Sequence, residues 1–457
     1  MSAQLTRGRG GITMTSGSLW KNIFLFSIPL IFSQLLQVMF NMADVAVVGK
    51  FANATALGSV GSTTTLVTLF TGFLIGLGSG VNVRVAQHLG ARQEQETRNA
   101  VHTALLICTL AGLCISVLCF FLAGPMLRML RTKDDLLPGA ELYFRIYALG
   151  MPALGIFNFG NAVLSASGDT KRPLVYLTAA GILNVILNLF FVIVCKMAAD
   201  GVALASILSQ YLSAALVLGH MLQMKDACRV EWKLLRFHKE EVGRLLGLGV
   251  PAGVQNMIFA VANLFIQVGV NSFDSTMVSG NSAAANVDSI VYNVMAAFYT
   301  ACSTFMGQNW GAGKHDRMMK SYYISLVYAF ASGAVLGLGL LWFGEGFLYL
   351  FTNDADVVAA GMQRMRIMCF SYAISAFMDN TIAASRGLGR SLVPTVIVIL
   401  GSCVFRVIWV YTVFAYFHTI PSLYLLYAFS WSITAVAEII YYSACWRKLK
   451  AGKTASV

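Results

Sequence analysis

One carboxylate, Asp44, lies inside an apolar stretch of the sequence, FNMADVAVVGKF, which covers residues 40–51. The four residues after it are Val, Ala, Val and Val, which offer no partner for a charge. In lipid, an ionised group near the middle of a helix costs about 3 kcal/mol on insertion scales. Such an acid must be neutral or must face polar partners, and either state suits the binding and release of an ion.

The composition decides whether this stretch lies in water or in lipid. Of the 457 residues, 57% are hydrophobic and only 11% are charged, whereas a soluble domain carries about 25% charged residues. The sequence therefore predicts an integral membrane protein. The nine cysteines form no CxxC pattern, so we expect small apolar side chains rather than a zinc site or a disulfide framework.

Twelve apolar segments are long enough to cross a bilayer, which takes about 20 residues per helix. They lie near residues 22–48, 54–80, 100–123, 141–164, 174–195, 201–223, 245–273, 286–306, 321–344, 358–383, 393–416 and 424–446. No segment shows the period-two alternation of a barrel strand. The sequence thus predicts an all-α membrane protein with 12 transmembrane helices.

The basic residues predict the orientation of these spans. With the N-terminus placed inside, 23 Lys and Arg residues fall in cytoplasmic segments and five in outer segments. Because cytoplasmic loops are enriched in Lys and Arg, both termini are expected in the cytoplasm. This topology accounts for the net charge of +12, so binding of nucleic acid is not expected.

The second half of the chain repeats landmarks of the first half. Pro29 and Pro251 are separated by 222 residues, and the other matched pairs by 221. These other pairs are Gln87 and Gln308, Gly90 and Gly311, Arg145 and Arg366, Gly168 and Gly389, and Pro173 and Pro394. Two six-span lobes with one membrane orientation predict a pseudo-twofold axis along the membrane normal, an arrangement typical of transporters.

The repeat gives a domain organisation. We predict a cytoplasmic tail at 1–18, without a secretory signal, an N-terminal lobe at 19–224 and a polar, basic linker at 225–244. A C-terminal lobe at 245–446 and a second tail at 447–457 follow.

Several segments carry a family resemblance. They are SIPLIFSQLLQVMFNMADVAVVG, VAQHLGAR, SGDTKRP and LNVILNLFF in the first half, and VPAGVQN, GQNWGAG and SRGLGRSLVP in the second. In order, spacing and duplication the chain resembles the multidrug and toxic compound extrusion (MATE) transporters from about residue 17 to 446. The resemblance implies efflux of amphipathic, often cationic, drugs or toxins across the plasma membrane, in exchange for protons or sodium. We expect a monomer in contact with lipid, with no cofactor and no bound metal.

The resemblance implies that Asp44 is the coupling residue of the N-terminal lobe. Asn184 and Asn188 share one helix face, and Ser206 supplies a hydroxyl where the family commonly has Thr. Family members often have Asp at the place of Asn188, so one carboxylate remains and protons are favoured over sodium. Two structural alternatives stay open: an ion pair of Asp44 with Lys50, and hydrogen bonds between helices for the two asparagines.

The first span also carries a polar and aromatic stripe. Gln34, Gln37, Phe40 and Asp44 are spaced three, three and four residues apart, which predicts a face toward a substrate cavity. Pro29 and its counterpart Pro251 are predicted hinges, because a proline frees carbonyls from the helical ladder.

In the C-terminal lobe, Phe259 stands where some family members have Glu. Asp379 and Arg406 are the candidate residues that remain, either for coupling or as a structural ion pair. Glu438 and Asp288 are expected to be solvated or interfacial.

Other function classes have less support. NWGAGKHD lacks the spacing of a phosphate-binding loop, so an ion gradient is the expected energy source. A lipid-linked sugar or lipid flippase would need more basic residues than the four in or near spans, Arg145, Arg364, Arg366 and Arg406. The motifs HExxH and GxSxG are absent, which argues against a membrane-embedded enzyme.

Overall fold

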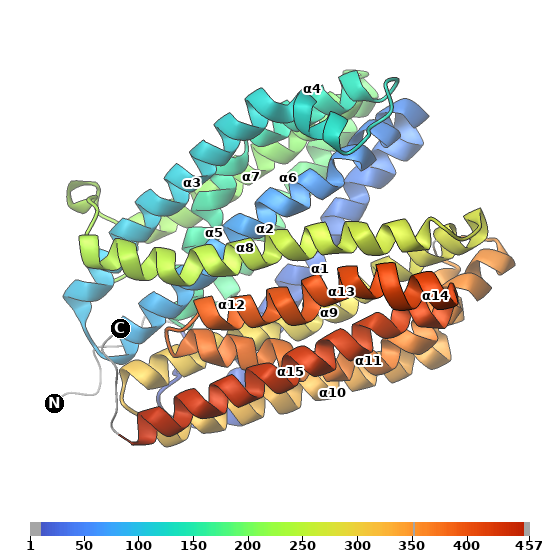
Figure 1. The fold of residues 1–457 in the computed structure, drawn as a ribbon. Coiled ribbons are helices and arrows are strands. Elements are labelled where there is room, and N and C mark those ends of the chain that lie inside the picture. Colours follow the sequence, from blue (N-terminus) through green and yellow to red (C-terminus); the bar gives the residue numbers. More distant parts are fainter. Residues whose placement is uncertain (1–10, 351, 452–457) are drawn as a thin grey trace. The chain divides into compact units, whose positions relative to one another are not determined.

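The structure is a computed structural model that describes residues 11–350 and 352–451 (Figure 1). Within these ranges every regular element is a helix. The elements are α1 (Leu19–Phe51), α2 (Ala54–Gly90), α3 (Glu94–Met129), α4 (Leu137–Ala148), α5 (Met151–Ala166), α6 (Lys171–Leu189), η1 (Phe190–Val194), α7 (Ala199–Gln223), η2 (Trp232–Leu234), α8 (Lys239–Val270), α9 (Ser275–Gly311), α10 (His315–Leu348), α11 (Ala355–Gly387), α12 (Leu392–Val398), η3 (Ile399–Val404), α13 (Phe405–Trp409), η4 (Val410–Phe414), α14 (Ala415–Phe417) and α15 (Ile420–Lys450).

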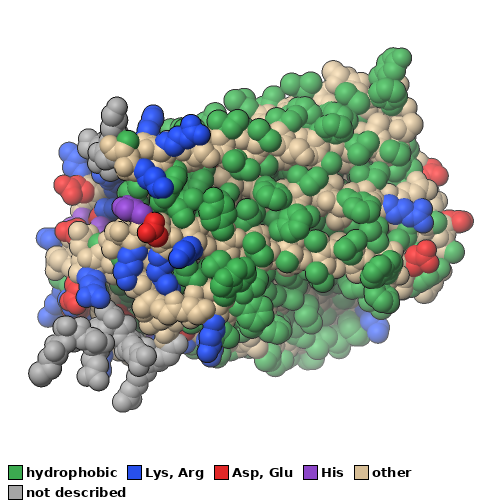
Figure 2. Space-filling model, turned by 90° about the horizontal axis from the view of Figure 1, so that it is seen from below, with side chains coloured by type: hydrophobic (Ala, Val, Ile, Leu, Met, Phe, Trp, Pro, Cys, Tyr) green, Lys and Arg blue, Asp and Glu red, His purple; other side chains and the backbone are tan. Residues whose placement is uncertain are grey.

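Most of these helices suit a membrane. In the described part of the chain, ten helices are long and apolar enough to cross a bilayer, and the bent pair α4 and α5 would make an eleventh span. Many large apolar side chains are exposed along them, among them Phe32, Phe121 and Trp342. On the face drawn in Figure 2, hydrophobic side chains cover the middle, and charged side chains gather toward the ends. A surface of this kind is typical of a lipid-facing protein, since soluble monomers rarely expose such large apolar patches.

The helix α9 is long but is not among the ten apolar helices. Its first half, STMVSGNSAAANVDS, is rich in small and polar residues. Two of them, Asn281 and Asp288, contact a buried arginine of α11. The polarity of α9 therefore has a structural reason, because its side chains satisfy a charge inside the helix bundle.

The chain divides into two compact units. The first combines Ile28–Met257 with the described residues up to Met14, and the second combines Thr15–Ser27 with the described residues from Ile258 on. The start of α1 therefore belongs to the second unit, and the rest of α1, from next to Pro29 on, belongs to the first. Conversely, the start of α8 belongs to the first unit, and its last part, after Pro251, belongs to the second.

Within the first unit, α2 and the beginning of α8 approach each other very closely. A Cβ atom added to Gly76 would lie 2.4 Å from the backbone N of Gly253, and one added to Gly80 would lie 2.5 Å from the N of Gly249. Small residues four apart let two membrane helices pack backbone to backbone. Asn256 reinforces the contact, since its amide donates to the Gly72 carbonyl at 2.9 Å.

Replacing Gly76 by Ala is expected to lower the thermal stability of the protein. The new methyl group would overlap backbone rather than a movable side chain, and overpacking of this kind costs about 1–3 kcal/mol. The measurement is the unfolding temperature of the purified protein in detergent. The matched control is Gly247→Ala on α8, where an added Cβ meets nothing within 4 Å. Equal unfolding temperatures for the two variants would contradict the close packing.

The two repeats share a local irregularity. The π-helix η1 follows α6 directly, and the π-helix η4 occupies nearly the same place in the second repeat. Because π-helical turns are rare and are often found at functional sites, their presence in both repeats makes these segments candidates for a functional role. In the first repeat, η1 begins two residues after Asn188.

Candidate functional site

The polar residues predicted for the N-terminal lobe come together around Asp44. The amide of Asn188 donates to Asp44 Oδ1, and the hydroxyl of Ser206 donates to Asp44 Oδ2 at 3.2 Å. Asn188 Nδ2 also lies 3.1 Å from Asn184 Oδ1, and Asn184 Nδ2 lies 3.5 Å from Ser206 Oγ. Side chains of three helices, α1, α6 and α7, thus form one hydrogen-bond network around a single carboxyl group.

This network is largely shielded from the outside of the unit. Asn188 is 0% exposed, Asn184 and Ser206 are each 6% exposed, and Asp44 is half-buried. The predicted hydrogen bonding between helices by the two asparagines is therefore present, and it includes the acid. Asn188 Oδ1 is buried and has no hydrogen-bond partner among the described residues. An oxygen acceptor thus lies beside the carboxyl group.

The alternative partner of Asp44, Lys50, is placed elsewhere. Its side chain is exposed at the end of α1, with Nζ 5.8 Å from the centre of the Phe51 ring. Asp44 forms no ion pair with a described basic residue, so Asn188 and Ser206 are its direct partners. The alternative in which Asp44 forms an ion pair with Lys50 is therefore not realised in the structure.

The stripe on α1 faces α6 at two of its positions. A Cβ added to Gly181 would lie 1.8 Å from Phe40 Cε2, so the Phe40 ring packs directly on this glycine, one turn before Asn184. Gln34 and Gln37 are half-buried on the same stripe. Phe40 and Asp44 of α1 thus both contact α6. A role of the two glutamines in a substrate cavity stays a prediction.

Two tyrosines of α4 belong to the surroundings of Asp44, and the sequence analysis missed them. The rings of Tyr143 and Tyr147 are stacked with centroids 6.0 Å apart, and both side chains interact electrostatically with Asp44. The available signal was their spacing of four residues in LYFRIYALG, which places two hydroxyl groups on one face of an apolar helix.

In the second unit, Arg406 lies in an aromatic cage. Its guanidinium carbon is 4.6 Å from the ring centre of Tyr427 and 5.6 Å from those of Phe259 and Trp431. Its Nε donates to Ser430 Oγ at 3.2 Å. Stacking on aromatic faces stabilises a desolvated guanidinium by about 2 kcal/mol or more.

The proposed ion pair of Arg406 with Asp379 is not formed. The two charges interact electrostatically, but the direct contacts of the guanidinium are Ser430 and the three rings. Phe259, at the place where some family members have an acid, instead supplies one wall of the cage. Whether Asp379 takes part in coupling stays a prediction.

A second buried arginine, Arg364 of α11, forms an ion pair with Asp288 of α9 and donates to Asn281 Oδ1. Tyr372 donates to the same carboxylate, and Tyr424 donates to Asn281 Oδ1 at 2.7 Å. The side chains of Arg364 and Asp288 are only 8% and 16% exposed. We call these five residues the Arg364 cluster.

Two expectations about acids of the second unit are therefore wrong. Asp288 is not solvated or interfacial, because it is paired inside the Arg364 cluster. Glu438 is not solvated either, since it is 0% exposed. Hydropathy alone placed both residues near the ends of predicted spans. It does not show which face of each helix is buried.

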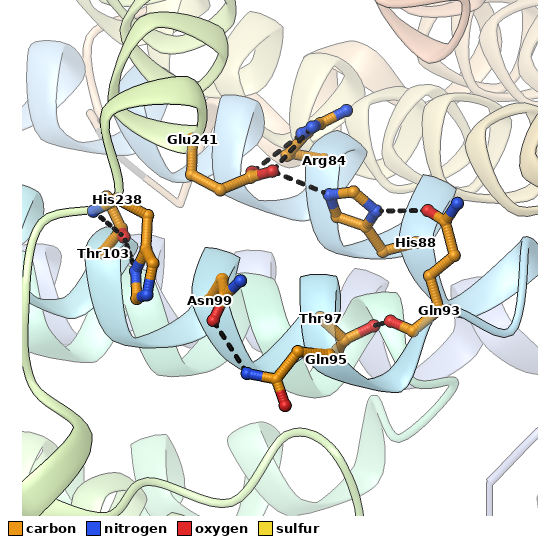
Figure 3. Close-up of polar contacts among 9 residues, drawn as sticks. All are labelled: Arg84, His88, Gln93, Gln95, Thr97, Asn99, Thr103, His238 and Glu241. Carbon is orange, nitrogen blue, oxygen red and sulfur yellow. Dashed lines mark hydrogen bonds and ion pairs between the residues drawn. The ribbon is translucent and has the colours of Figure 1, made fainter.

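A polar cluster ties the end of α2 to the start of α8 within the first unit (Figure 3). Arg84 donates from Nε and Nη2 to the two carboxylate oxygens of Glu241 at 2.9 and 2.7 Å. His88 Nε2 lies 3.1 Å from the same carboxylate, and His88 Nδ1 lies 3.0 Å from Gln93 Oε1. The loop before α8 is held as well, because the His238 backbone N–H donates to Thr103 Oγ1 at 3.2 Å.

This cluster and the close glycine packing hold the beginning of α8 against α2. A bidentate Arg–carboxylate pair combines charge with fixed geometry, and Glu241 is only 3% exposed. The first part of α8 is thus a rigid member of the first unit, up to the region of Pro251.

Comparison with known proteins agrees with the repeat. The model of the MatE family matches the chain twice, over residues 29–190 and 251–412. The chain is 30% identical over 376 residues to the probable multidrug resistance protein YpnP of Bacillus subtilis, a match that covers 82% of this chain and 84% of that protein. It is 24% identical over 347 residues to the FAD transporter of Shewanella oneidensis, covering 73% and 74% of the two chains.

A solved structure shows the same fold. A multidrug resistance MATE family transporter of the MOP superfamily, solved in an outward-facing conformation, matches 97% of this chain and 100% of its own, with a TM-score of 0.90 at 19% identity. The double match of the family model and the extent of the similarity to YpnP show the family. The chain belongs to the multidrug and toxic compound extrusion family of multi-pass membrane transporters.

Proposed function

We propose that this protein is a secondary active antiporter that exports amphipathic, often cationic, compounds in exchange for protons, with Asp44 as the coupling residue. The observation that carries the proposal is the network of Asn184, Asn188 and Ser206 around one carboxyl group. It lies in a helix bundle where a charge without partners would be costly.

The network serves both protonation states of Asp44. The ionised carboxylate accepts from the Asn188 amide and the Ser206 hydroxyl, as in the structure. A protonated carboxyl group needs an acceptor, and a hydroxyl oxygen or the buried Asn188 Oδ1 supplies one. Loss or gain of one proton would therefore rearrange hydrogen bonds between α1, α6 and α7, which is how a local charge change can bias helix packing.

Sodium is the alternative coupling ion. The site offers carboxylate, amide and hydroxyl oxygens, which are the ligands that hard cations prefer. It holds one acid only, because Asn188 stands where family members often have Asp. One negative charge is weaker compensation for a sodium ion in a buried site, and this favours the proton.

Asn188→Asp is expected to shift the protein toward sodium dependence. Two neighbouring carboxylates cannot both be ionised without compensation, so the variant must bind a cation or keep one acid protonated. The measurement is dye efflux from vesicles with and without sodium at fixed pH. Asn188→Ala is the control, since it removes the amide without adding an acid. A variant that stays indifferent to sodium while remaining active would contradict this expectation.

The substrate class rests on the relatives and on the resemblance. YpnP is described as a probable multidrug resistance protein, whereas the Shewanella relative is a FAD transporter. A direct test compares accumulation of ethidium, a cationic dye, with that of FAD in cells that lack other exporters. Lower ethidium accumulation on expression supports multidrug export. Unchanged ethidium together with FAD export would move the protein to the second substrate class.

The membrane arrangement extends the same proposal. We infer 12 spans with both termini in the cytoplasm of a plasma-membrane monomer, supported by the excess of Lys and Arg in the segments assigned to the cytoplasm. Pro29 and Pro251 are the proposed hinges, since α1 and α8 each change unit near their proline. A flippase has less support, because Arg364 and Arg406 are already occupied by protein contacts.

A further inference from the structure

Glu438 is an acid of α15 that has no role in the proposed mechanism. The residue is 0% exposed, and neither carboxylate oxygen has a hydrogen-bond partner among the described residues. It lies near the middle of α15, which is long and apolar enough to cross a membrane. This acid is therefore enclosed by protein without any direct compensation.

These surroundings favour the protonated, neutral form of the Glu438 carboxyl group. An ionised carboxylate without hydrogen bonds in an apolar interior is far more costly than a neutral carboxyl group, so the group takes up a proton. Asp288, another acid of this unit with low exposure, differs in this respect because Arg364 and Tyr372 contact its carboxylate directly. Burial thus favours the neutral form of Glu438, whereas Asp288 is held as an ion-pair partner of Arg364.

The charged groups near Glu438 come from neighbouring helices. On α11, Arg386 and Asp379 both interact electrostatically with it, and Arg406 of α13 interacts with Asp379. The segments α12, η3 and η4 also pack on α15 and contain no charged residue. One basic group that favours the ionised form and one acid that opposes it therefore surround Glu438, so its proton can leave when their distances change.

A polar stripe links Glu438 to the aromatic cage. Ser430, Thr434 and Glu438 are spaced four residues apart on α15, and all three are 0% exposed. Ser430 accepts from Arg406 at 3.2 Å, and the hydroxyls of Thr434 and Ser402 lie 2.9 Å apart. Inside an otherwise apolar helix, this stripe places hydroxyl groups next to the acid.

We propose that Glu438 is a second proton-binding site of the transporter, located in the second unit. The inference rests on the proposed function, in which protons drive export. Glu438 holds a proton in the conformation described here and releases it in a state where Arg386 approaches more closely. The transport cycle then moves a proton at each of two acids, Asp44 and Glu438.

Infrared spectroscopy of the purified protein tests the protonation state without transport. Wild type at neutral pH is expected to show a C=O band of a protonated carboxylic acid that Glu438→Gln removes and Glu438→Asp retains. Glu345→Gln, at an exposed acid of α10 in the same unit, should leave the band unchanged. A spectrum of Glu438→Gln identical to that of wild type would overturn the inference.

The number of protons exchanged per ethidium molecule in proteoliposomes tests the role in transport. Glu438→Gln is expected to lower this number while Glu345→Gln does not. An unchanged number with active transport would overturn the second proton site and leave the proposed function standing. Wild-type transport driven by sodium alone, without proton movement, would instead overturn the proposed function and this inference together.

Discussion

Asp44→Asn is expected to abolish proton-driven efflux, reducing it to the level of membranes without the protein. The amide keeps the size and hydrogen-bonding capacity of the side chain, so Asn188 and Ser206 can still contact it. It cannot bind or release a proton, and the charge change that drives the rearrangement between α1, α6 and α7 is lost. The measurement is dye efflux from everted vesicles after a pH gradient is imposed.

The controls for Asp44 separate chemistry from folding. Asp134→Asn changes an exposed acid in the loop between α3 and α4 of the same unit and should leave efflux intact. Asp44→Glu restores an ionisable group and should recover part of the activity. Full efflux by Asp44→Asn would return Asp44 to a structural role and would direct the search for the coupling residue to Asp379.

Arg364→Met is expected to destabilise the protein by about 3–5 kcal/mol, because removing one partner of a buried ion pair leaves an uncompensated charge. Asp288 would lose its ion pair, and Asn281 would lose one of its two donors. Met has a similar length, so the expected effect comes from the charge and the hydrogen bonds. The measurement is the unfolding temperature of the purified protein in detergent.

Arg366→Met is the matched control for this variant. Arg366 lies two residues away on α11 and is exposed, so its removal should change stability little. A double variant, Arg364→Met with Asp288→Asn, should recover part of the lost stability because it no longer buries an unpaired charge. Equal stability of the two single variants would show that the Arg364 cluster does not stabilise the second unit.

Periodicity and the repeat predicted the all-helical membrane fold because burial in lipid imposes long apolar segments. The break of the fourth predicted span into α4 and α5, bent by 45°, was not visible in its hydropathy. Neither was the assignment of the starts of α1 and α8 to opposite units, since it depends on contacts between helices far apart in sequence. The glycines at positions 76 and 80 carried a signal for close packing, but the sequence does not name their partner helix.

The candidate site was predictable where one helix face carries several polar residues. The spacing of Asn184 and Asn188, together with the resemblance, gave the group that the structure assembles around Asp44. The second unit was less predictable, because buried charges there are satisfied by aromatic rings and by residues on other helices. Arg406 illustrates this, since its cage combines Phe259 of α8 with Tyr427 and Trp431 of α15.

The exchange of protons for substrate through Asp44 is tested most directly in proteoliposomes of the purified protein. Proton movement and ethidium movement are followed together, in sodium-free buffer and at fixed pH with a sodium gradient. Wild type is expected to couple the two movements without sodium, and Asp44→Asn is expected to show neither. Ethidium transport that requires sodium, or proton-coupled transport that persists in Asp44→Asn, would contradict the account.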